Sequence, residues 1–516
     1  MKTNYIFISI MLLITTACNN DFLEKLPQDT LSPETFYSNG NNLSTALTGV
    51  YDALQNDNNF GKLPELDGIT DNGVHFKYET EFISYAQGIA NANVTQRFAT
   101  YYQAGYQLIQ RANILLDNIN APGSILQAER NTIAAEARAL RAIAYMRLTY
   151  LYGDVPLITK FTQLAEIKTV SRTSKSQIVS FVLDELRYAA DNLATTPYNN
   201  VKGRITKQAA LAFRAKVMVY EARLGNKPWE DALTAVNEAV TSASGAGADL
   251  YYSTTPTDGV ANYEGLFSLA KIDNKEILFA VKNNTLDKGT NLYTYFAVGG
   301  GNLSLSVHTN LVTDFYCTDG LPITSSPLYN AAEPYKNRDP RLKANISVPG
   351  DTYSTGTLML AFKGKTTIGV LQTDFAIKKM TTTDGLVQNQ GQLDVPVMRY
   401  ADLLLLHAEA ENQVNGSSTI AYAAINKVRK RAGVADVAAG LSKLAFGQEV
   451  IHERRIELAF EGQRWFDLIT LKLANQKINE VGELNRKFVP NQQELFPIPQ
   501  TEIDINPNLL PNNKGY

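Results

Sequence analysis

The 516-residue chain has few of the residues from which common catalytic and metal sites are built. It contains 2 Cys, 4 His and 2 Trp, so a disulfide-rich scaffold is excluded at this length. None of the histidines forms an HExxH pair, and no Cys/His set has zinc spacing. The GxSxG motif of serine esterases is absent as well. The sequence therefore does not support these common hydrolase classes.

An excess of charge of one sign and long apolar runs are also lacking. The chain has 48 Lys and Arg against 51 Asp and Glu, and no run of like charges marks a basic stripe. A nucleic-acid partner is therefore not expected. Beyond the N-terminus, no apolar run reaches the roughly 18 residues of a membrane-spanning helix. Apolar residues make up 44% and charged residues 19%, a composition typical of globular proteins with a sizeable core.

The N-terminus has the pattern of a lipoprotein leader. Met1-Lys2 is followed by an apolar run over 5–14 and then by Thr15-Thr16-Ala17-Cys18. A basic start, a short apolar stretch and small residues before a cut predict a secretory signal over 1–17. We expect lipidation of Cys18, because the polar residues that follow suit a tether; an ordinary signal peptide with an incidental Cys is the alternative. Asn19, rather than Asp, permits sorting to the outer membrane.

Helical periodicity predicts that most of the chain to about residue 245 is helical. Apolar residues recur at helical spacing over 101–119 and 134–152. Ser174 and Gln177 form a capping box, Thr206 is expected to cap a helix to about 222, and Pro228 to open one to about 240. Successive helices begin about 30 residues apart, which suggests stacked helix pairs of the tetratricopeptide kind. From periodicity alone, an irregular helical domain fits equally well.

The composition changes between 246 and 396, where Gly, Thr, Ser, Asn and Asp increase and short β-type runs such as 277–281 appear. Helices are predicted again at 399–414, 419–432 and 448–473. Long loops in a compact protein are usually functional. The sequence thus predicts a helical scaffold to about 245, a loop-rich ligand region over 246–396, and C-terminal helices with a tail over 397–516.

Glu453, Glu457 and Glu461 are the best candidate acids, because a spacing of four places them on one helix face. A pair of carboxylates at such a distance suits a retaining glycosidase. Arg454 and Arg455 lie among them, however, and nearby cations lower a carboxyl pKa, whereas a general acid needs a raised one. An ion-pair ladder is therefore the favoured interpretation.

Several stretches together resemble one family. They are Ala46-Leu47-Thr48-Gly49-Val50-Tyr51, Tyr152-Gly153-Asp154-Val155-Pro156-Leu157, Asn337-Arg338-Asp339-Pro340-Arg341-Leu342, Glu453-Arg454-Arg455-Ile456-Glu457, Arg464-Trp465-Phe466-Asp467-Leu468 and Pro497-Ile498-Pro499. In this order they resemble the SusD/RagB family of outer-membrane lipoproteins, over nearly the whole chain.

This resemblance implies a mainly α, SusD-like fold of tetratricopeptide-like repeats with long loops and small β insertions, in a single domain over 18–516. It implies a surface-exposed, lipid-anchored protein that passes an oligosaccharide, or in some members a peptide, to a TonB-dependent outer-membrane receptor of the SusC type. No cofactor, metal or catalytic step is implied. The arginine and aspartate motifs are expected to be structural, through bidentate pairs that hold loops to helices.

Sugar binding without catalysis uses aromatic faces and a few polar partners. Two aromatic clusters lie in the expected loops, and the alternative for both is packing beneath the loops. The candidates are Phe76, Tyr78, Phe82 and Tyr85 with Asp71 and Asn72, and Tyr293, Tyr295 and Phe296 with Asn302. Period-2 spacing predicts that Tyr293 and Tyr295 share one face.

Two further function classes stay open at this point. A surface glycan hydrolase would have a carboxylate pair in a cleft, and a tetratricopeptide adaptor would bind only protein in a helical groove.

Overall fold

The computed structural model describes residues 36–76, 78–89, 91, 96–284, 288–298, 302–354, 359–366, 371–381 and 391–516. The fold is mainly helical with small sheets, as predicted. Cys18 and the predicted signal peptide lie outside the described residues. Across the part of the chain that is described, no helix combines the length and apolar character that crossing a bilayer requires.

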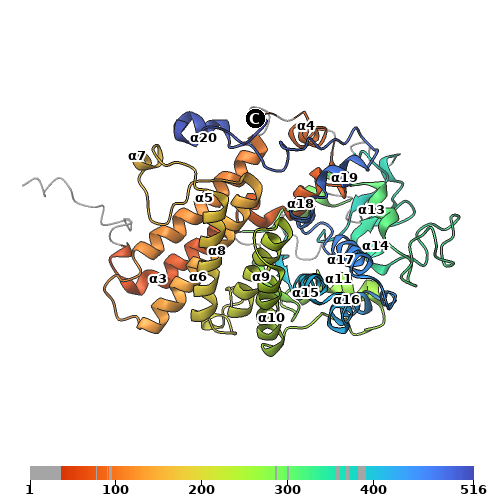
Figure 1. Ribbon diagram of the computed structural model, residues 1–516, viewed down its shortest axis with the longest axis horizontal. Helices are drawn as coiled ribbons and strands as arrows, with labels where there is room; N and C mark the ends of the chain where they lie inside the picture. The colour runs from red at the N-terminus through yellow and green to blue at the C-terminus, as the bar shows by residue number, and fades with distance from the viewer. Residues whose placement is uncertain are drawn as a thin grey trace, which may run out of the picture.

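Long helices form a row in which each contacts the next (Figure 1). The row is α5 (Gln96–Asp117), α6 (Gln127–Tyr152), α8 (Lys175–Asn192), α9 (Lys207–Leu224), α10 (Trp229–Gly245), α15 (Tyr400–Asn415) and α16 (Thr419–Ala432), and α3 (Leu43–Leu54) packs on α5 and α6. The stacked helix pairs predicted from the spacing are therefore present. Because α10 packs on α15, the row joins the N-terminal helices directly to the C-terminal ones.

Close packing in this row depends on small residues at the crossings. A Cβ atom on Gly105 of α5 would lie 3.0 Å from the side chain of Leu148 on α6, tighter than ordinary van der Waals contact. Helix α6 is buried over most of its circumference, as expected for a helix covered on both sides by neighbours.

The predicted helix starts are confirmed, with two corrections. The Ser174 hydroxyl accepts a hydrogen bond from the backbone N–H of Gln177 and so caps α8. In place of the reciprocal bond of a capping box, the Gln177 side-chain oxygen accepts from the Ser174 hydroxyl at 2.8 Å. Pro228 occupies the N-cap position of α10. Thr206 occupies that of α9, but its side chain makes no capping hydrogen bond, so it does not act as the predicted cap.

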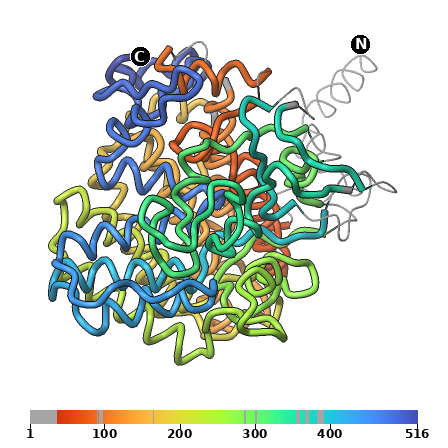
Figure 2. Tube along the Cα trace, turned by 90° about the vertical axis from the view of Figure 1, so that its right-hand side faces the viewer, coloured from red at the N-terminus to blue at the C-terminus, as the bar shows by residue number. Residues whose placement is uncertain are grey.

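Among the described residues, the middle region carries three small antiparallel sheets, and it lies across the face seen in Figure 2, in green to teal. The four-stranded sheet has the order β1 (Gly73–His75), β3 (Leu305–Val307), β7 (Ala376–Ile377), β4 (Ile346–Ser347). The predicted β run is β2 (Ile277–Val281), which pairs with β8 (Val395–Arg399), while β5 (Thr352–Ser354) pairs with β6 (Met359–Ala361). Short helices between the strands are α11 (Gly259–Leu266), α12 (Leu292–Phe296), α13 (Thr309–Asp314) and α14 (Pro340–Asn345).

One C-terminal prediction is wrong: the stretch 448–473 is not a single helix. It comprises α17 (Lys443–Glu457) and α18 (Arg464–Thr470), separated by a turn. Helix α17 ends at Glu457, and the left-handed backbone conformations of Phe460 and Gly462, with φ of 63° and 68°, keep the helix from continuing into α18. The remaining short elements are α4 (Thr80–Ala86), α7 (Leu164–Ile167), α19 (Ala474–Asn479), α20 (Gln500–Ile505), the π-type turn η3 (Asp57–Gly61) and the 3-10 helices η2 (Gly40–Asn42), η4 (Leu63–Ile69), η5 (Tyr198–Asn200), η6 (Leu269–Lys271), η7 (Gly364–Thr366) and η8 (Pro507–Leu509).

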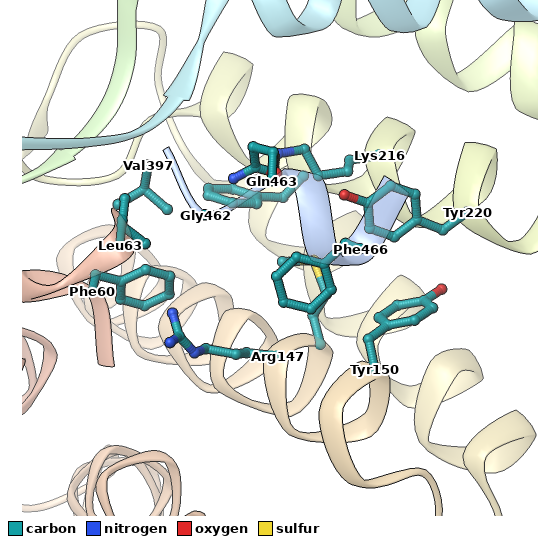
Figure 3. A pocket seen from close by; sticks show the side chains of 12 residues that line it. Phe60, Leu63, Arg147, Tyr150, Lys216, Tyr220, Val397, Gly462, Gln463 and Phe466 are labelled. Carbon is teal, nitrogen blue, oxygen red and sulfur yellow. Dashed lines mark hydrogen bonds between the residues drawn. The ribbon is translucent and has the colours of Figure 1, made fainter. Parts of the chain in front are cut away.

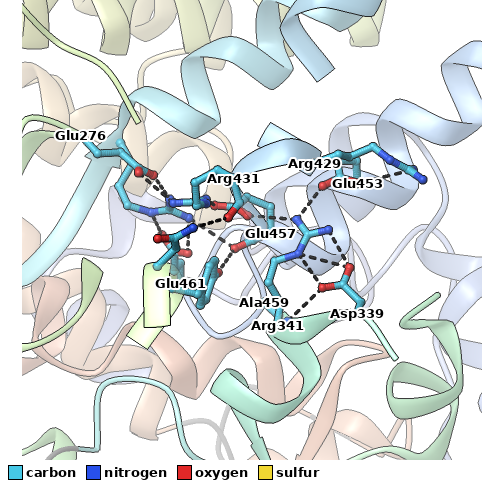
Figure 4. A network of polar contacts seen from close by, with 12 residues as sticks. Glu276, Asp339, Arg341, Arg429, Arg431, Glu453, Glu457, Ala459 and Glu461 are labelled. Atoms are coloured by element: carbon cyan, nitrogen blue, oxygen red, sulfur yellow. Dashed lines mark hydrogen bonds and ion pairs between the residues drawn. The ribbon is translucent and has the colours of Figure 1, made fainter. Parts of the chain in front are cut away.

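A buried ionic network lies where these C-terminal elements meet the middle region (Figure 4). Glu457 accepts from Arg341, Arg399 and Arg431, which come from α14, β8 and α16. Arg341 also pairs with Glu453 at 2.5 Å, and Arg399 also pairs with Glu461 at 2.6 Å, so these two arginines extend the network. We call these residues, with Glu276, Asp339, Lys379 and Arg429, the ionic network.

The network confirms the ion-pair interpretation of the three glutamates but changes its geometry. Glu461 lies beyond the end of α17, so the three carboxylates do not share one helix face. Their partners also come from distant segments rather than from the adjacent Arg454 and Arg455. The network thus joins parts of the chain far apart in sequence.

Candidate functional site

The structure brings the two predicted aromatic clusters together. Strands β1 and β3 pair antiparallel, with His75 opposite Leu305. Beyond the strands, the backbone N–H of Phe76 donates to Ser304 at 3.0 Å, and that of Ser304 donates to Tyr295 at 2.7 Å. The sequence presented the clusters as alternatives, whereas strand pairing places their segments side by side. We call the rings there that are not in the core, Phe76, Tyr78, Tyr293 and Tyr295, the aromatic surface.

Within this surface, the local geometry of the second cluster differs from the prediction. Leu292–Phe296 is the short helix α12, not an extended strand. Successive side chains on a helix are about 100° apart, so Tyr293 and Tyr295 lie about 200° apart instead of sharing a face. Tyr293 and Tyr295 are half-buried, and Phe296 is 1% exposed and belongs to the core.

The first cluster also divides into exposed and buried members. Tyr78 is 65% exposed and meets the half-buried Phe76 edge-on, with 5.9 Å between ring centroids. Phe82 is buried and stacks on His75, and the buried Tyr85 hydroxyl donates to the carbonyl of Gln493 at 2.9 Å. Packing beneath the loop thus accounts for Phe82 and Tyr85.

Asp71 and Asn72 do not face this surface. The Asp71 carboxylate binds Arg464 at 2.7 Å, and the Asn72 amide oxygen accepts from Arg455 at 2.9 Å. Burial raises the pKa of Asp71, but the guanidinium groups of Arg455 and Arg464 outweigh it and hold the pKa well below its usual range. Both residues hold the turn after η4 against α17 and α18, so their role in this structure is structural.

A polar cleft of about 460 Å³ lies beside α12. It is formed by the end of α3, the turn η3, one side of α5 and the segment before α12. Its lining residues are Asp52, Ala53, Gln55, Asn56, Asp57, Asn58, Lys62, Arg97, Gln107, Arg111, Lys288, Gly289 and Asn291. We call this the polar cleft.

The polar cleft adjoins the aromatic surface through Lys62, whose ammonium lies 3.9 Å from the centre of the Tyr295 ring. Asn291, one residue before α12, donates its amide to the Asp57 carboxylate at 2.7 Å. Arg97, at the start of α5, is bound to Glu65 at 2.5 Å. The half-buried Tyr295 thus borders the polar cleft, and the exposed Asn302 lies next to the same helix, because its backbone N–H donates to Thr294 at 2.6 Å.

Both signs of charge are present in the cleft. Asp52 is bound to Arg111 at 2.5 Å and to Lys288 at 3.0 Å. Burial raises the pKa of Asp52, but the hydrogen bonds from Arg111 and Lys288 bring it below its ordinary value, so the carboxylate stays ionised near neutral pH. The cleft therefore offers charged donors and acceptors that remain partly exposed to a ligand.

Sequence reasoning missed the cleft residues Asp57, Lys62, Arg97 and Asn291. No motif marks them, and they come from three segments that only the tertiary structure brings together. The polar stretch Gln55-Asn56-Asp57-Asn58 was the available local signal.

Glu457, at the centre of the ionic network, is unsuited to acid catalysis. Burial raises the pKa of Glu457, but Arg431, Arg399 and Arg341 outweigh it and hold the pKa well below its usual range. Its side chain is 0% exposed, so no substrate reaches it. Within the described ranges, no three His, Cys, Asp or Glu side chains are grouped so as to hold a metal ion.

Comparison with known proteins agrees with this architecture. A family model described as the SusD family matches residues 275–516, and one described as starch-binding and associating with the outer membrane matches 21–219. A SusD-like protein of Formosa agariphila is 27% identical, with both chains covered completely.

Two solved structures show the same fold. A SusD-like carbohydrate-binding protein of Bacteroides fragilis has 25% identity and a TM-score of 0.79, over 92% of this chain and 100% of that one. A laminarin-binding SusD-like protein has 21% identity and a TM-score of 0.72, over 92% of this chain and 99% of that one.

The stacked helices, the loop-rich middle region and the cleft at its edge define a helical protein of the ligand-binding class. The chain belongs to the SusD/RagB family, a family that the matched descriptions associate with carbohydrate binding and the outer membrane.

Proposed function

We propose that the protein is a non-enzymatic, surface-exposed lipoprotein of the outer membrane. It binds an oligosaccharide at the polar cleft and the adjoining aromatic surface, and delivers it to a TonB-dependent receptor of the SusC type. The observation that carries this proposal is the joining of aromatic rings and partly exposed polar groups at one place on a SusD-like fold. Aromatic faces with a few directed polar groups are the features that sugar recognition requires.

Ligand binding is tested by calorimetry on purified protein with a glycan panel that includes laminarin and starch oligosaccharides, the glycans in the descriptions of relatives. We expect one class to bind, and Asp57→Ala to weaken its binding. The matched control is Asp319→Ala, which removes a carboxylate outside the polar cleft. Binding that is equal in both variants contradicts the cleft assignment, and a panel without any binder contradicts an oligosaccharide ligand.

A peptide is the second candidate ligand, and the charges of the cleft favour it. Asp52, Lys62, Arg97 and Lys288 place both signs along one cleft, which neutral sugars do not require. The same calorimetric series therefore includes peptides of mixed charge and uronic-acid oligosaccharides. Binding of peptides alone would replace the oligosaccharide assignment.

The anchor and the absence of catalysis need separate tests. Cys18→Ser should remove acylation and release the protein from membranes of cells that lack the receptor partner. Equal membrane partitioning of wild type and variant under these conditions contradicts lipidation at Cys18. Purified protein should leave the panel glycans and peptides intact, and cleavage that a carboxylate substitution abolishes would contradict the non-enzymatic assignment.

The transporter partner is tested by affinity purification of the tagged wild-type protein from native membranes solubilised in mild detergent. We expect a TonB-dependent receptor to co-purify, with the untagged strain as control. Recovery of the lipoprotein without such a receptor contradicts the delivery role.

A further inference from the structure

A second cleft lies among α13, α17 and α19, which meet at the right of Figure 1. We call it the α13–α17 cleft, and among its lining residues are Asp314, Tyr316, Gln448, Glu449, His452 and Arg455, which differ from those of the polar cleft. Its volume is about 620 Å³. Pockets that hold small ligands measure about 300–1,000 Å³, so a short oligosaccharide fits here. By contrast, the pocket of about 30 Å³ between α6, α9 and α18 in Figure 3 is too small for a sugar ring.

A stacked aromatic pair forms part of the wall of this cleft. Tyr316, two residues after α13, is half-buried, and its ring lies against that of His452 from α17, with 3.9 Å between the ring centres and 17° between the planes. Nε2 of His452 donates to the backbone carbonyl of Asp314 at 2.7 Å, so the stack is held from both elements. A tyrosine ring fixed in this way offers a flat apolar face on which a sugar ring can pack.

Carboxylates with paired charges lie beside the Tyr316 ring. Burial raises the pKa of Tyr316, and the charges of Glu449 and Asp314 raise it further, which places both carboxylates close to its hydroxyl. The side chain of Asp314 is 37% exposed and binds Arg455 at 2.6 Å. That of Glu449 is 26% exposed and lies 3.5 Å from the Arg429 guanidinium. Each carboxylate is therefore balanced by an arginine but is still partly exposed in the cleft.

This arrangement suits hydroxyl groups better than ions. A carboxylate has about four acceptor sites, so a hydroxyl can donate to Asp314 or Glu449 while the arginine stays bound. A charged ligand would instead have to displace one partner of an ion pair. The exposed amide of Gln448 adds a donor and an acceptor to the lining. An aromatic face with a few directed polar groups is the combination that sugar binding requires.

The α13–α17 cleft is separate from the aromatic surface. Asp71, which lines the cleft, lies two residues before β1, whereas Phe76 of the aromatic surface follows β1 directly. The three-residue strand alone spans roughly 10 Å at about 3.3 Å per residue, so one sugar ring cannot contact both. A sugar bound in the cleft therefore occupies a site of its own.

We propose that the α13–α17 cleft is a second oligosaccharide-binding site. A sugar ring packs against Tyr316, and its hydroxyl groups donate to Asp314 and Glu449. Two sites on one molecule allow a long glycan to be held at two points, which slows its release. The ligand class rests on the proposed function, whereas the residues are different, so either site can be absent without the other.

Calorimetry separates the two sites. The purified protein is titrated with laminarihexaose, maltohexaose and cellohexaose, in wild type and in Asp57→Ala, which weakens the polar cleft. We expect one hexaose to keep binding to Asp57→Ala. Adding Tyr316→Ala should weaken this binding by about tenfold or more, whereas Tyr316→Phe, which keeps the ring, should retain it. Tyr252→Ala, which removes an exposed ring outside both clefts, is the matched control.

The results of these titrations assign binding to one cleft, to the other or to both. Binding that Asp57→Ala abolishes and Tyr316→Ala leaves unchanged overturns the second site but retains the polar cleft. Binding that only Tyr316→Ala weakens retains the second site and contradicts the polar cleft. If no hexaose binds, or if Tyr316→Ala behaves as Tyr252→Ala does, the proposal is overturned.

Crystallography gives a readout that needs no variant. Wild-type crystals soaked with the hexaose that binds most tightly should show a sugar ring packed against Tyr316. Crystals in which the hexaose is absent from this place overturn the proposal. The same measurement decides the question if Tyr316→Ala does not fold.

Discussion

The ionic network and the polar cleft are both rich in charge, yet they differ in exposure and in origin. Members of the network such as Glu457, Arg399 and Arg431 are almost completely buried, and each bonds to several partners. In the cleft, the side chains of Asp52, Arg111 and Lys288 are 37–49% exposed, and each of the two cations pairs with Asp52. Many residues of the network belong to the motifs that carry the family resemblance, whereas the residues of the cleft lie outside those motifs. The residues that are easiest to recognise thus hold the fold together.

Breaking the network should give the largest effect. Glu457→Gln leaves the Arg341, Arg399 and Arg431 guanidiniums with too little negative charge, and removing one partner of a buried ion pair typically costs about 3–5 kcal/mol. Urea denaturation measures the loss, with Glu333→Gln at an exposed ion pair as control. Ligand affinity of the folded variant should stay unchanged. A cost as small as that of the control would remove the distinction between the two regions.

Two neighbouring aromatic residues of α12 sharpen the comparison within the proposed binding surface. Phe296→Ala should cost about 3–5 kcal/mol of stability, because its ring is fully buried, and should not alter intrinsic ligand affinity. Tyr295→Ala should cost less stability but weaken ligand binding by about 1–3 kcal/mol, because its half-buried ring adjoins Lys62 of the cleft. A melt and a titration of each variant separate the outcomes. Unchanged affinity in Tyr295→Ala would leave Tyr78 as the remaining exposed aromatic candidate.

Acid should weaken the ionic network. Since the pKa of Glu457 is below its ordinary value in the folded protein, the unfolded chain takes up the proton first as pH falls through about 4.3. The stabilising contribution of Glu457 is therefore present above that pH and is lost below it, by up to about 1.4 kcal/mol per pH unit. The free energy of unfolding is measured in urea between about pH 5 and pH 3, which brackets the pKa of an ordinary glutamate. It should fall less steeply with decreasing pH in Glu457→Gln than in wild type. Parallel slopes would mean that Glu457 does not titrate in this manner.

The smallest effect is expected at the exposed pair of the cleft. Lys288→Gln removes one partner of Asp52, which keeps Arg111, and exposed pairs contribute about 0.2–1 kcal/mol. Its stability cost should diminish further at high salt because solvent ions screen the pair. Denaturation at low and high salt measures this, and a salt-independent loss above 1 kcal/mol would place Lys288 in a structural role like that of the network.

The sequence by itself determined the helical architecture, because apolar periodicity and capping residues act within a few residues of one another. It predicted the 419–432 helix with its observed bounds, the Ser174 cap and the strand at 277–281. It also predicted that the glutamates around 457 form ion pairs. It failed where a left-handed turn at Gly462 interrupts an otherwise helical pattern, because apolar spacing does not report backbone conformation.

Only the tertiary structure decided which candidate residues are exposed and which are buried. Asp71, Phe82 and Phe296 have the composition of a binding surface, but burial depends on contacts with segments distant in sequence. The pairing of β1 with β3 joined two loops that lie more than 200 residues apart, and the fold of η3 against α5 and α12 created the polar cleft. Such long-range contacts leave no local pattern, since each segment satisfies its own periodicity whatever partner it meets.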